Sequence, residues 1–200
     1  ISFDTNIGHD YLENVDQRYD FYHLQEDKSP FDIELLNTIT KGGVSRKTLN
    51  IVLAGTGVGK SLAMCHFAAD NLRQGKNVLY ITLEMAEEKI AERIDANLLD
   101  VQIDQIENLP RDTFKTKVSK IREKTQGKLI IKEYPTATAH VGHFRALLDE
   151  LRMKKDFAPD SIYIDYLNIC ASSRMKGLGG SVNTYSYIKA IAEELRGLAV

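Results

Sequence analysis

Residues 50–61 read Asn-Ile-Val-Leu-Ala-Gly-Thr-Gly-Val-Gly-Lys-Ser, and the organisation of the chain can be worked out from this stretch. It opens with an apolar run rich in β-branched residues, which predicts a buried strand. The run stops at a glycine-dense loop, and a helix-compatible stretch, 62–74, follows at once. Strand, glycine-rich loop and helix in this order predict a phosphate-binding loop.

The chemistry of such a loop explains its residue types. Phosphate oxygens are held by several backbone N–H groups that point inward together, and glycines permit the tight path because they tolerate positive φ. Lys60 would reach the β- and γ-phosphates, and the Ser61 hydroxyl would take a place on Mg²⁺. The residues predicted to bind ATP or another NTP are Ala54, Gly55, Thr56, Gly57, Val58, Gly59, Lys60 and Ser61.

The usual signature of this loop is Gly-x-x-x-x-Gly-Lys-Ser/Thr, and Ala54 stands at its first position here. The alternative interpretation is a glycine-rich turn with an incidental Gly-Lys-Ser. Because strand, loop and helix fall in register, nucleotide binding is favoured.

The composition predicts one main soluble, intracellular domain. The 200 residues are 43% hydrophobic, which is enough for one sizeable core. No apolar run approaches the ~18 residues of a membrane span, so no membrane partner is expected. The net charge of −2 leaves no overall basic field, and any nucleic-acid contact must be local. Cys65 and Cys170 are predicted to be buried free thiols, and His140 and His143 to be solvated or locally bonded rather than metal ligands.

The fold class expected from the pattern is α/β, a mostly parallel sheet with helices on both faces. Predicted strands alternate with amphipathic helices over about 150 residues, which is typical of that architecture. The four predicted strands are Thr48–Ala54, Asn77–Leu83, Lys128–Glu133 and Ser161–Leu167. The predicted helices are 8–24, 31–40, 60–74, one beginning just after Glu84, 110–126, one capped by Thr138, and 184–200.

The first of these helices carries an aromatic stripe. Tyr11, Val15, Tyr19 and Tyr22 recur at helical spacing, and a polar, proline-marked connection, 26–30, separates them from the core. The stripe must be buried somewhere, either on its own domain or on a neighbour. Residues 1–30 are therefore expected to form a helix and connection that could act as a docking arm, and 31–200 the core.

Two acids are predicted to lie beside the phosphate loop. Asp165 ends an apolar strand, and in a parallel sheet the carboxyl ends of the strands share one edge, so Asp165 is placed to hold Mg²⁺. Glu84 ends another strand at the same edge and could orient and deprotonate the water that attacks the γ-phosphate. From position alone, Glu84 could equally be a helix N-terminal acid, as Glu87 and Glu88 could be.

A glycine-rich segment, 171–183, follows the Asp165 strand. It is mildly basic through Arg174 and Lys176, which makes it a candidate for contact with a phosphate backbone. A connection without such a role is an equal alternative.

Taken together, these motifs resemble the RecA-like motor of DnaB-family replicative helicases, those of T-even phages in particular. The stretches that carry the resemblance are Asn6–Asp10, Gly42–Val44, Arg46–Asn50, Leu83–Met85 followed by Arg93, Asp165–Leu167 and Ile188–Leu195. The resemblance implies a hexameric ring that hydrolyses NTP and moves 5′ to 3′ on single-stranded DNA in the cytoplasm, the host's if the gene is a phage's. It implies Lys60, Ser61 and Asp165 as Mg-nucleotide ligands and Glu84 as catalytic base.

The same resemblance implies further partners and missing parts. The N-terminal helix matches the linker helix that docks on the adjacent subunit, and a primase, a helicase loader and a single-strand-binding protein are expected partners. The chain stops before the strand of the γ-phosphate sensor and before the arginine finger, so these residues alone are expected to hydrolyse little. A RecA/RadA-type recombinase or a KaiC-like ring ATPase is the alternative, since both share the core.

Overall fold

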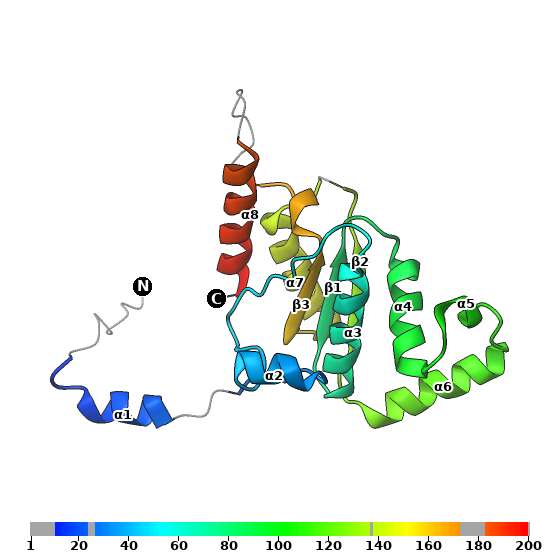
Figure 1. Ribbon diagram of the computed structural model, residues 1–200, viewed down its shortest axis with the longest axis horizontal. Helices are drawn as coiled ribbons and strands as arrows, with labels where there is room; N and C mark the ends of the chain where they lie inside the picture. The colour runs from blue at the N-terminus through cyan, green and yellow to red at the C-terminus, as the bar shows by residue number, and fades with distance from the viewer. Residues whose placement is uncertain (1–10, 24–26, 137, 173–182, 200) are drawn as a thin grey trace.

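The computed structural model describes residues 11–23, 27–136, 138–172 and 183–199. Figure 1 shows a central sheet with helices on either side and an N-terminal helix, α1, that stands apart from them. The helices are α1 (Val15–His23), α2 (Glu34–Thr40), α3 (Lys60–Arg73), α4 (Glu87–Leu99), α5 (Ile103–Ile106), α6 (Arg111–Lys124), α7 (Val141–Lys155), the 3₁₀ turn η1 (Leu167–Ile169) and α8 (Thr184–Ala199). The strands are β1 (Val78–Thr82), β2 (Leu129–Glu133) and β3 (Ser161–Asp165).

The sheet is parallel, and β1 lies at its centre. The strand order is β2-β1-β3, with Thr82 opposite both Glu133 and Asp165. Every residue of β1 is buried, as expected of a central strand whose two faces are both covered. The carboxyl ends of the three strands therefore share one edge, and Asp165 comes to this edge beside the end of β1.

Two apolar clusters fill the space above and below the sheet. Alternate residues of β1 point to opposite faces, so Leu79 and Ile81 pack on α7 and α8, while Val78 and Tyr80 pack on α3 and α4. Each helix contributes the apolar residues that its 3.6-residue period brings to one side. In α4 these include Ile90 and, one turn later, Ile94. The expected α/β class with covered faces is confirmed.

The predicted strand at Thr48–Ala54 is wrong for the described structure. Residues 48–55 form no strand, and Ile51, Val52 and Leu53 are exposed to 62%, 43% and 94%. A strand needs a neighbour to pair its backbone N–H and C=O groups. Among the described residues, no backbone hydrogen bond joins 48–54 to the sheet. The apolar pattern is present, but the pairing that would bury it is not.

The start of α7 also differs from the expectation. Its N-cap is His140, whose Nδ1 accepts from the Gly142 N–H at 3.0 Å, while His143 Nδ1 accepts from the His140 N–H at 3.2 Å. The predicted cap, Thr138, instead donates its hydroxyl to the Pro135 carbonyl. The two histidines are thus locally bonded, as predicted, because an imidazole nitrogen can replace the usual capping oxygen.

Within the described ranges no helix is long and apolar enough to cross a membrane. Both cysteines, Cys65 and Cys170, are free and buried, as the sequence predicts.

Candidate nucleotide-binding site

Two of the three glycines in the loop before α3, Gly57 and Gly59, have the positive φ that the sequence predicts, and Gly55 does not. Gly57 and Gly59 have φ of +77° and +107°, a region that L side chains rarely adopt, which explains glycine at both positions. Gly59 is the N-cap of α3, and no side-chain hydrogen bond caps it. The first turn of α3 carries no acidic residue either. The positive end of the helix dipole is therefore presented at Lys60 and Ser61 without a carboxylate to compensate it.

Lys60 lies against the residue that follows Asp165. Its Nζ is 3.8 Å from the centroid of the Tyr166 ring, within the range of a cation–π contact. Ser61 follows Lys60 in the first turn of α3 and is half-buried. The structure thus brings the end of the phosphate loop to the end of β3, as the sequence predicts. Tyr166 was not among the predicted site residues; its position directly after the strand-ending acid is the only signal in the sequence.

Asp165 is buried and only partly satisfied. Its side chain is 1% exposed, and Oδ2 accepts a hydrogen bond from the Tyr80 hydroxyl at 3.2 Å. Oδ1 has no hydrogen-bond partner among the described residues. A buried carboxylate oxygen without a donor is costly, and such an atom in a native protein calls for an explanation. Its place at the strand edge, beside the phosphate loop, points to a bound cation.

Tyr80 holds Asp165 from the interior of the sheet. Its ring is fully buried on β1, and its hydroxyl also lies 3.8 Å from the Cys65 sulfur. Burial first, and then the neighbouring Cys65 and Asp165, raise the pKa of Tyr80 far above its ordinary value, so the hydroxyl stays protonated. Sequence reasoning missed this residue, because a tyrosine in a central apolar strand is indistinguishable from a core side chain.

The residues present fit Mg²⁺. The unpartnered Asp165 Oδ1 and the Ser61 hydroxyl are hard oxygen donors, the type that this ion prefers. No group of three or more His, Cys, Asp and Glu suited to a metal occurs within the described ranges. Mg²⁺ does not need one, since it is usually held by one or two protein ligands together with phosphates and water.

Glu84 lies at the same sheet edge. It comes two residues after the end of β1, and the preceding Leu83 N–H donates to the Asp165 carbonyl at 2.9 Å. Glu84 is exposed and makes no hydrogen bond or ion pair within the described part of the chain. Glu87, by contrast, accepts from the Glu133 N–H at 2.8 Å and binds Lys132 at 3.7 Å. Glu87 therefore joins α4 to β2, whereas the Glu84 carboxylate has no partner among the described residues.

Comparisons with known proteins bear on the family and the fold of the chain. The sequence profile of the DnaB-like helicase C-terminal domain matches residues 30–200, most of the chain. The chain belongs to the DnaB-like helicase family. The resemblance extends to fold, since a solved ATPase domain superposes with a TM-score of 0.63 at 18% identity, covering 93% of this chain and 66% of that one.

Two curated proteins are similar in sequence. The DnaB-like replicative helicase of Enterobacteria phage T4 is 51% identical over 203 aligned positions, covering 100% of this chain and 42% of that protein. A probable plasmid replicative DNA helicase of Chlamydia psittaci is 30% identical over 161 positions, covering 78% of this chain and 33% of that protein. The chain spans less than half the length of either relative.

A solved structure of a DnaB-like replicative helicase, described with its interactions with primase, has the same fold. It superposes with a TM-score of 0.66 at 18% identity and covers 99% of this chain and 47% of that one. This likeness supports the same architecture for the present family member.

Two regions were predicted to make contacts outside the core, one with DNA and one through the N-terminal helix. Arg174 and Lys176, the candidate DNA contacts, lie outside the described residues. The predicted helix 8–24 is shorter among the described residues, because α1 begins at Val15 and Tyr11 lies in a turn before it. The four residues of the predicted stripe, Tyr11, Val15, Tyr19 and Tyr22, are exposed, at 71%, 52%, 63% and 70%. No residue of α1 is buried.

Proposed function

We propose that the protein is the motor part of an ATP-dependent replicative DNA helicase. In this proposal it assembles as a hexameric ring, hydrolyses NTP, moves 5′ to 3′ along single-stranded DNA and unwinds the duplex at the replication fork. The single observation that carries the proposal is the contact of Lys60 with Tyr166, directly after Asp165, whose buried Oδ1 has no partner in the described structure. The family membership of the chain supports it.

Each group at the sheet edge takes a separate task in this proposal. The backbone N–H groups of Gly55–Gly59 and the N-terminus of α3 bind the phosphates, and Lys60 neutralises the β- and γ-phosphates. Asp165 and Ser61 would hold Mg²⁺, which when bound neutralises the charge that develops on the phosphate oxygens. Tyr80 keeps Asp165 in place by its hydrogen bond to Oδ2, which leaves Oδ1 as the oxygen available to the cation.

Glu84 is proposed as the general base. A base must be able to reach the proton of the attacking water, and an exposed carboxylate that has no partner among the described residues is free to do so. Glu84 would take a proton from that water as its oxygen bonds to the γ-phosphorus, while the bond from the γ-phosphorus to the β–γ bridging oxygen breaks and NDP leaves with that oxygen.

Assembly and partners follow from the exposed arm and from the relatives. We propose that α1, whose aromatic side chains are exposed, docks on an adjacent subunit and builds the hexamer. Primase, a helicase loader and a single-strand-binding protein are proposed as partners, and Arg174 and Lys176 as contacts to the DNA backbone. The proposed site of action is the cytoplasm of the host cell if the gene is a phage's.

The test is NTP hydrolysis by the full-length protein with and without single-stranded DNA. We expect strong stimulation by DNA, its loss in Lys60→Ala, and in Glu84→Gln retained nucleotide binding without turnover. Unwinding of a duplex with a 5′ single-stranded tail, without strand exchange, separates a helicase from a recombinase. Hydrolysis indifferent to DNA would overturn the proposal in favour of a ring ATPase that acts on protein.

A further inference from the structure

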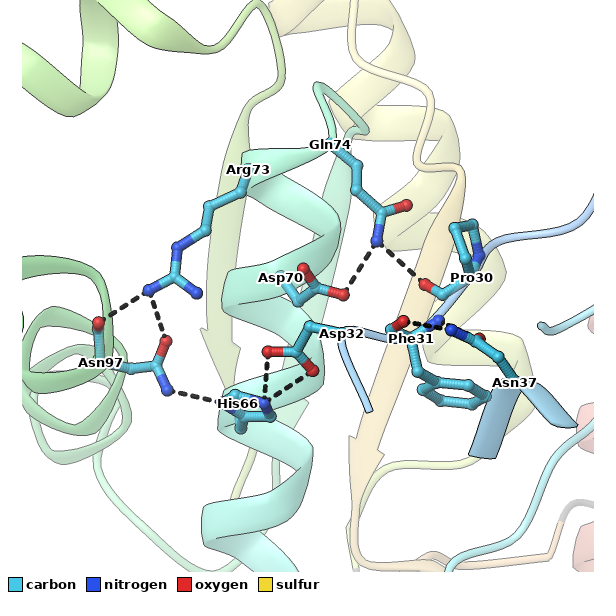
Figure 2. A network of polar contacts seen from close by, with 9 residues as sticks. All are labelled: Pro30, Phe31, Asp32, Asn37, His66, Asp70, Arg73, Gln74 and Asn97. Carbon is cyan, nitrogen blue, oxygen red and sulfur yellow. Dashed lines mark hydrogen bonds and ion pairs between the residues drawn. The ribbon is translucent and has the colours of Figure 1, made fainter. Parts of the chain in front are cut away.

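His66, in the second turn of α3, contacts two other parts of the chain with its two ring nitrogens. Nε2 lies 2.8 Å from each carboxylate oxygen of Asp32, in the segment before α2. Nδ1 lies 2.7 Å from the side-chain nitrogen of Asn97, near the end of α4. Figure 2 shows this side chain between the two partners, with Asp32 on one side and Asn97 on the other. One imidazole thus joins three elements of the fold.

The hydrogen bonds around His66 specify its protonation state. Arg73 Nη2 donates to the backbone carbonyl of Asn97 at 2.8 Å and to its Oδ1 at 2.9 Å. A guanidinium can only donate, so it fixes the amide oxygen of Asn97 on its own side and turns the amide NH₂ toward His66. Nδ1 must then accept, which leaves the ring proton on Nε2, where it is donated to Asp32. The network therefore requires neutral His66 in the Nε2–H form.

The segment that carries Asp32 is fastened to α3 at further points. The Phe31 ring packs edge-on against Phe67, with centroids 5.1 Å apart. At the end of α3, Gln74 Nε2 donates to the Pro30 carbonyl at 2.9 Å and to Asp70 Oδ2 at 2.8 Å. Residues 30–32 are thus held along much of one side of α3 (Figure 2). Because of these contacts, we expect residues 30–32 to move together with α3.

Both helices joined at His66 begin at or near the candidate nucleotide site. The first residue of α3 is Lys60, which would bind phosphate, and α4 begins at Glu87, three residues after Glu84. A helix transmits a displacement of one end to the other because its backbone hydrogen bonds hold it rigid. Through His66, a shift of either helix reaches Asp32, and the chain before Asp32 leads back to α1.

We propose that neutral His66 is a positioning residue that couples the nucleotide-dependent placement of α3 and α4 to the segment behind the N-terminal arm. This inference rests on the proposed nucleotide site. It goes beyond it by assigning the connection between that site and α1 to one side chain. In this proposal Asn97, held by Arg73, passes a displacement of α4 to His66. His66 passes it, together with any displacement of α3, to Asp32.

Two substitutions of His66 separate the two contacts. His66→Asn places an amide oxygen near the position of Nδ1, so it retains the bond to Asn97 and loses the bond to Asp32. His66→Gln places an amide near the position of Nε2, so it retains the bond to Asp32 and loses the bond to Asn97. Each is the matched control of the other, since both replace the imidazole by a neutral amide.

The experiment measures hydrogen exchange in α1 and α4 of the assembled full-length protein, with and without a non-hydrolysable ATP analogue. In the wild type, nucleotide should change exchange in both helices. In His66→Asn the response of α1 should fall at least about fivefold, the lower end of ordinary coupling between sites. In His66→Gln it should remain, and both variants should still bind the analogue.

The two variants also separate a coupling role from a merely structural one, because a structural role predicts the same α1 response in His66→Asn and in His66→Gln. An unchanged α1 response in His66→Asn, an equal loss in both variants, or a wild-type α1 that ignores bound nucleotide would overturn the coupling. Absence of nucleotide binding in the wild type would instead overturn the proposed function.

Discussion

The hydrogen bond from Tyr80 to Asp165 yields a quantitative prediction for Tyr80→Phe. Both residues are essentially inaccessible, at 0% and 1%, and the bond of 3.2 Å is the only one that the Asp165 carboxylate receives within the described ranges. A hydrogen bond to a charged group contributes about 1.5–3 kcal/mol. Loss of the hydroxyl leaves a buried carboxylate with no donor on either oxygen. We expect the free energy of unfolding to fall by about this amount in the absence of nucleotide.

Tyr163→Phe supplies a matched control for this change. Its ring stacks on Tyr80, with centroids 6.0 Å apart, and its hydroxyl accepts from Asn71 Nδ2 at 2.8 Å. That bond joins neutral groups, and Asn71 also donates to Ser161 at 3.0 Å, so it retains a partner. The control should therefore cost only about 0.5–1.5 kcal/mol, the usual worth of a neutral hydrogen bond.

The assay is thermal or urea unfolding followed by circular dichroism, since the chain has no tryptophan. In a protein of this size each kcal/mol shifts the midpoint temperature by about 2–4 °C, so Tyr80→Phe should lower it by roughly 3–12 °C. In an Asp165→Asn background the same substitution should cost no more than a neutral bond, because the charge is gone. Equal losses for Tyr80→Phe and Tyr163→Phe, or an undiminished loss beside Asn at 165, would refute the reasoning.

Three further changes test other contacts. In fluorescent-nucleotide titrations, Tyr166→Leu should strengthen nucleotide binding up to about fivefold. The reason is that the contact of Lys60 with the Tyr166 ring stabilises the nucleotide-free state by about 0.5–1 kcal/mol. Tyr166→Phe keeps an aromatic ring and should bind nucleotide nearly as the wild type does. Phe144→Ala should cost about 3–5 kcal/mol in urea unfolding because the ring is fully buried, whereas exposed Tyr22→Ala should be nearly neutral. Burial raises the pKa of Cys170 from 9.0 to about 12, so stability should fall as pH rises between these values, and Cys170→Ser should remove that dependence.

The helices show how far a sequence pattern can be followed. Amphipathic helices were predicted from the alternation pattern, and in α4, α7 and α8 the apolar residues Ile90, Phe144 and Ile191 are buried. In α6 no residue is buried, and Val118 is 38% exposed. Periodicity identifies the face of a helix, and packing decides whether it is buried.

The sequence by itself determined those features whose cause is local. Positive φ at Gly57 and Gly59, the start of α3 at Lys60 and the apolar pattern of β1 depend on residues a few positions apart, and all could be predicted. The shared edge of the strand ends also followed, because parallel pairing places Asp165 there whichever strands intervene.

Only the tertiary structure decided which groups meet across long separations. The hydroxyl of Tyr80 on Asp165, the ring of Tyr166 under Lys60 and the partners of His66 come from elements far apart in the chain, and no spacing rule relates them. The exposure of residues 51–53 has the same origin, since an apolar run is buried only where another strand pairs with it. Local preferences act through neighbouring residues, whereas hydrogen-bond partners and burial depend on the path of the whole chain.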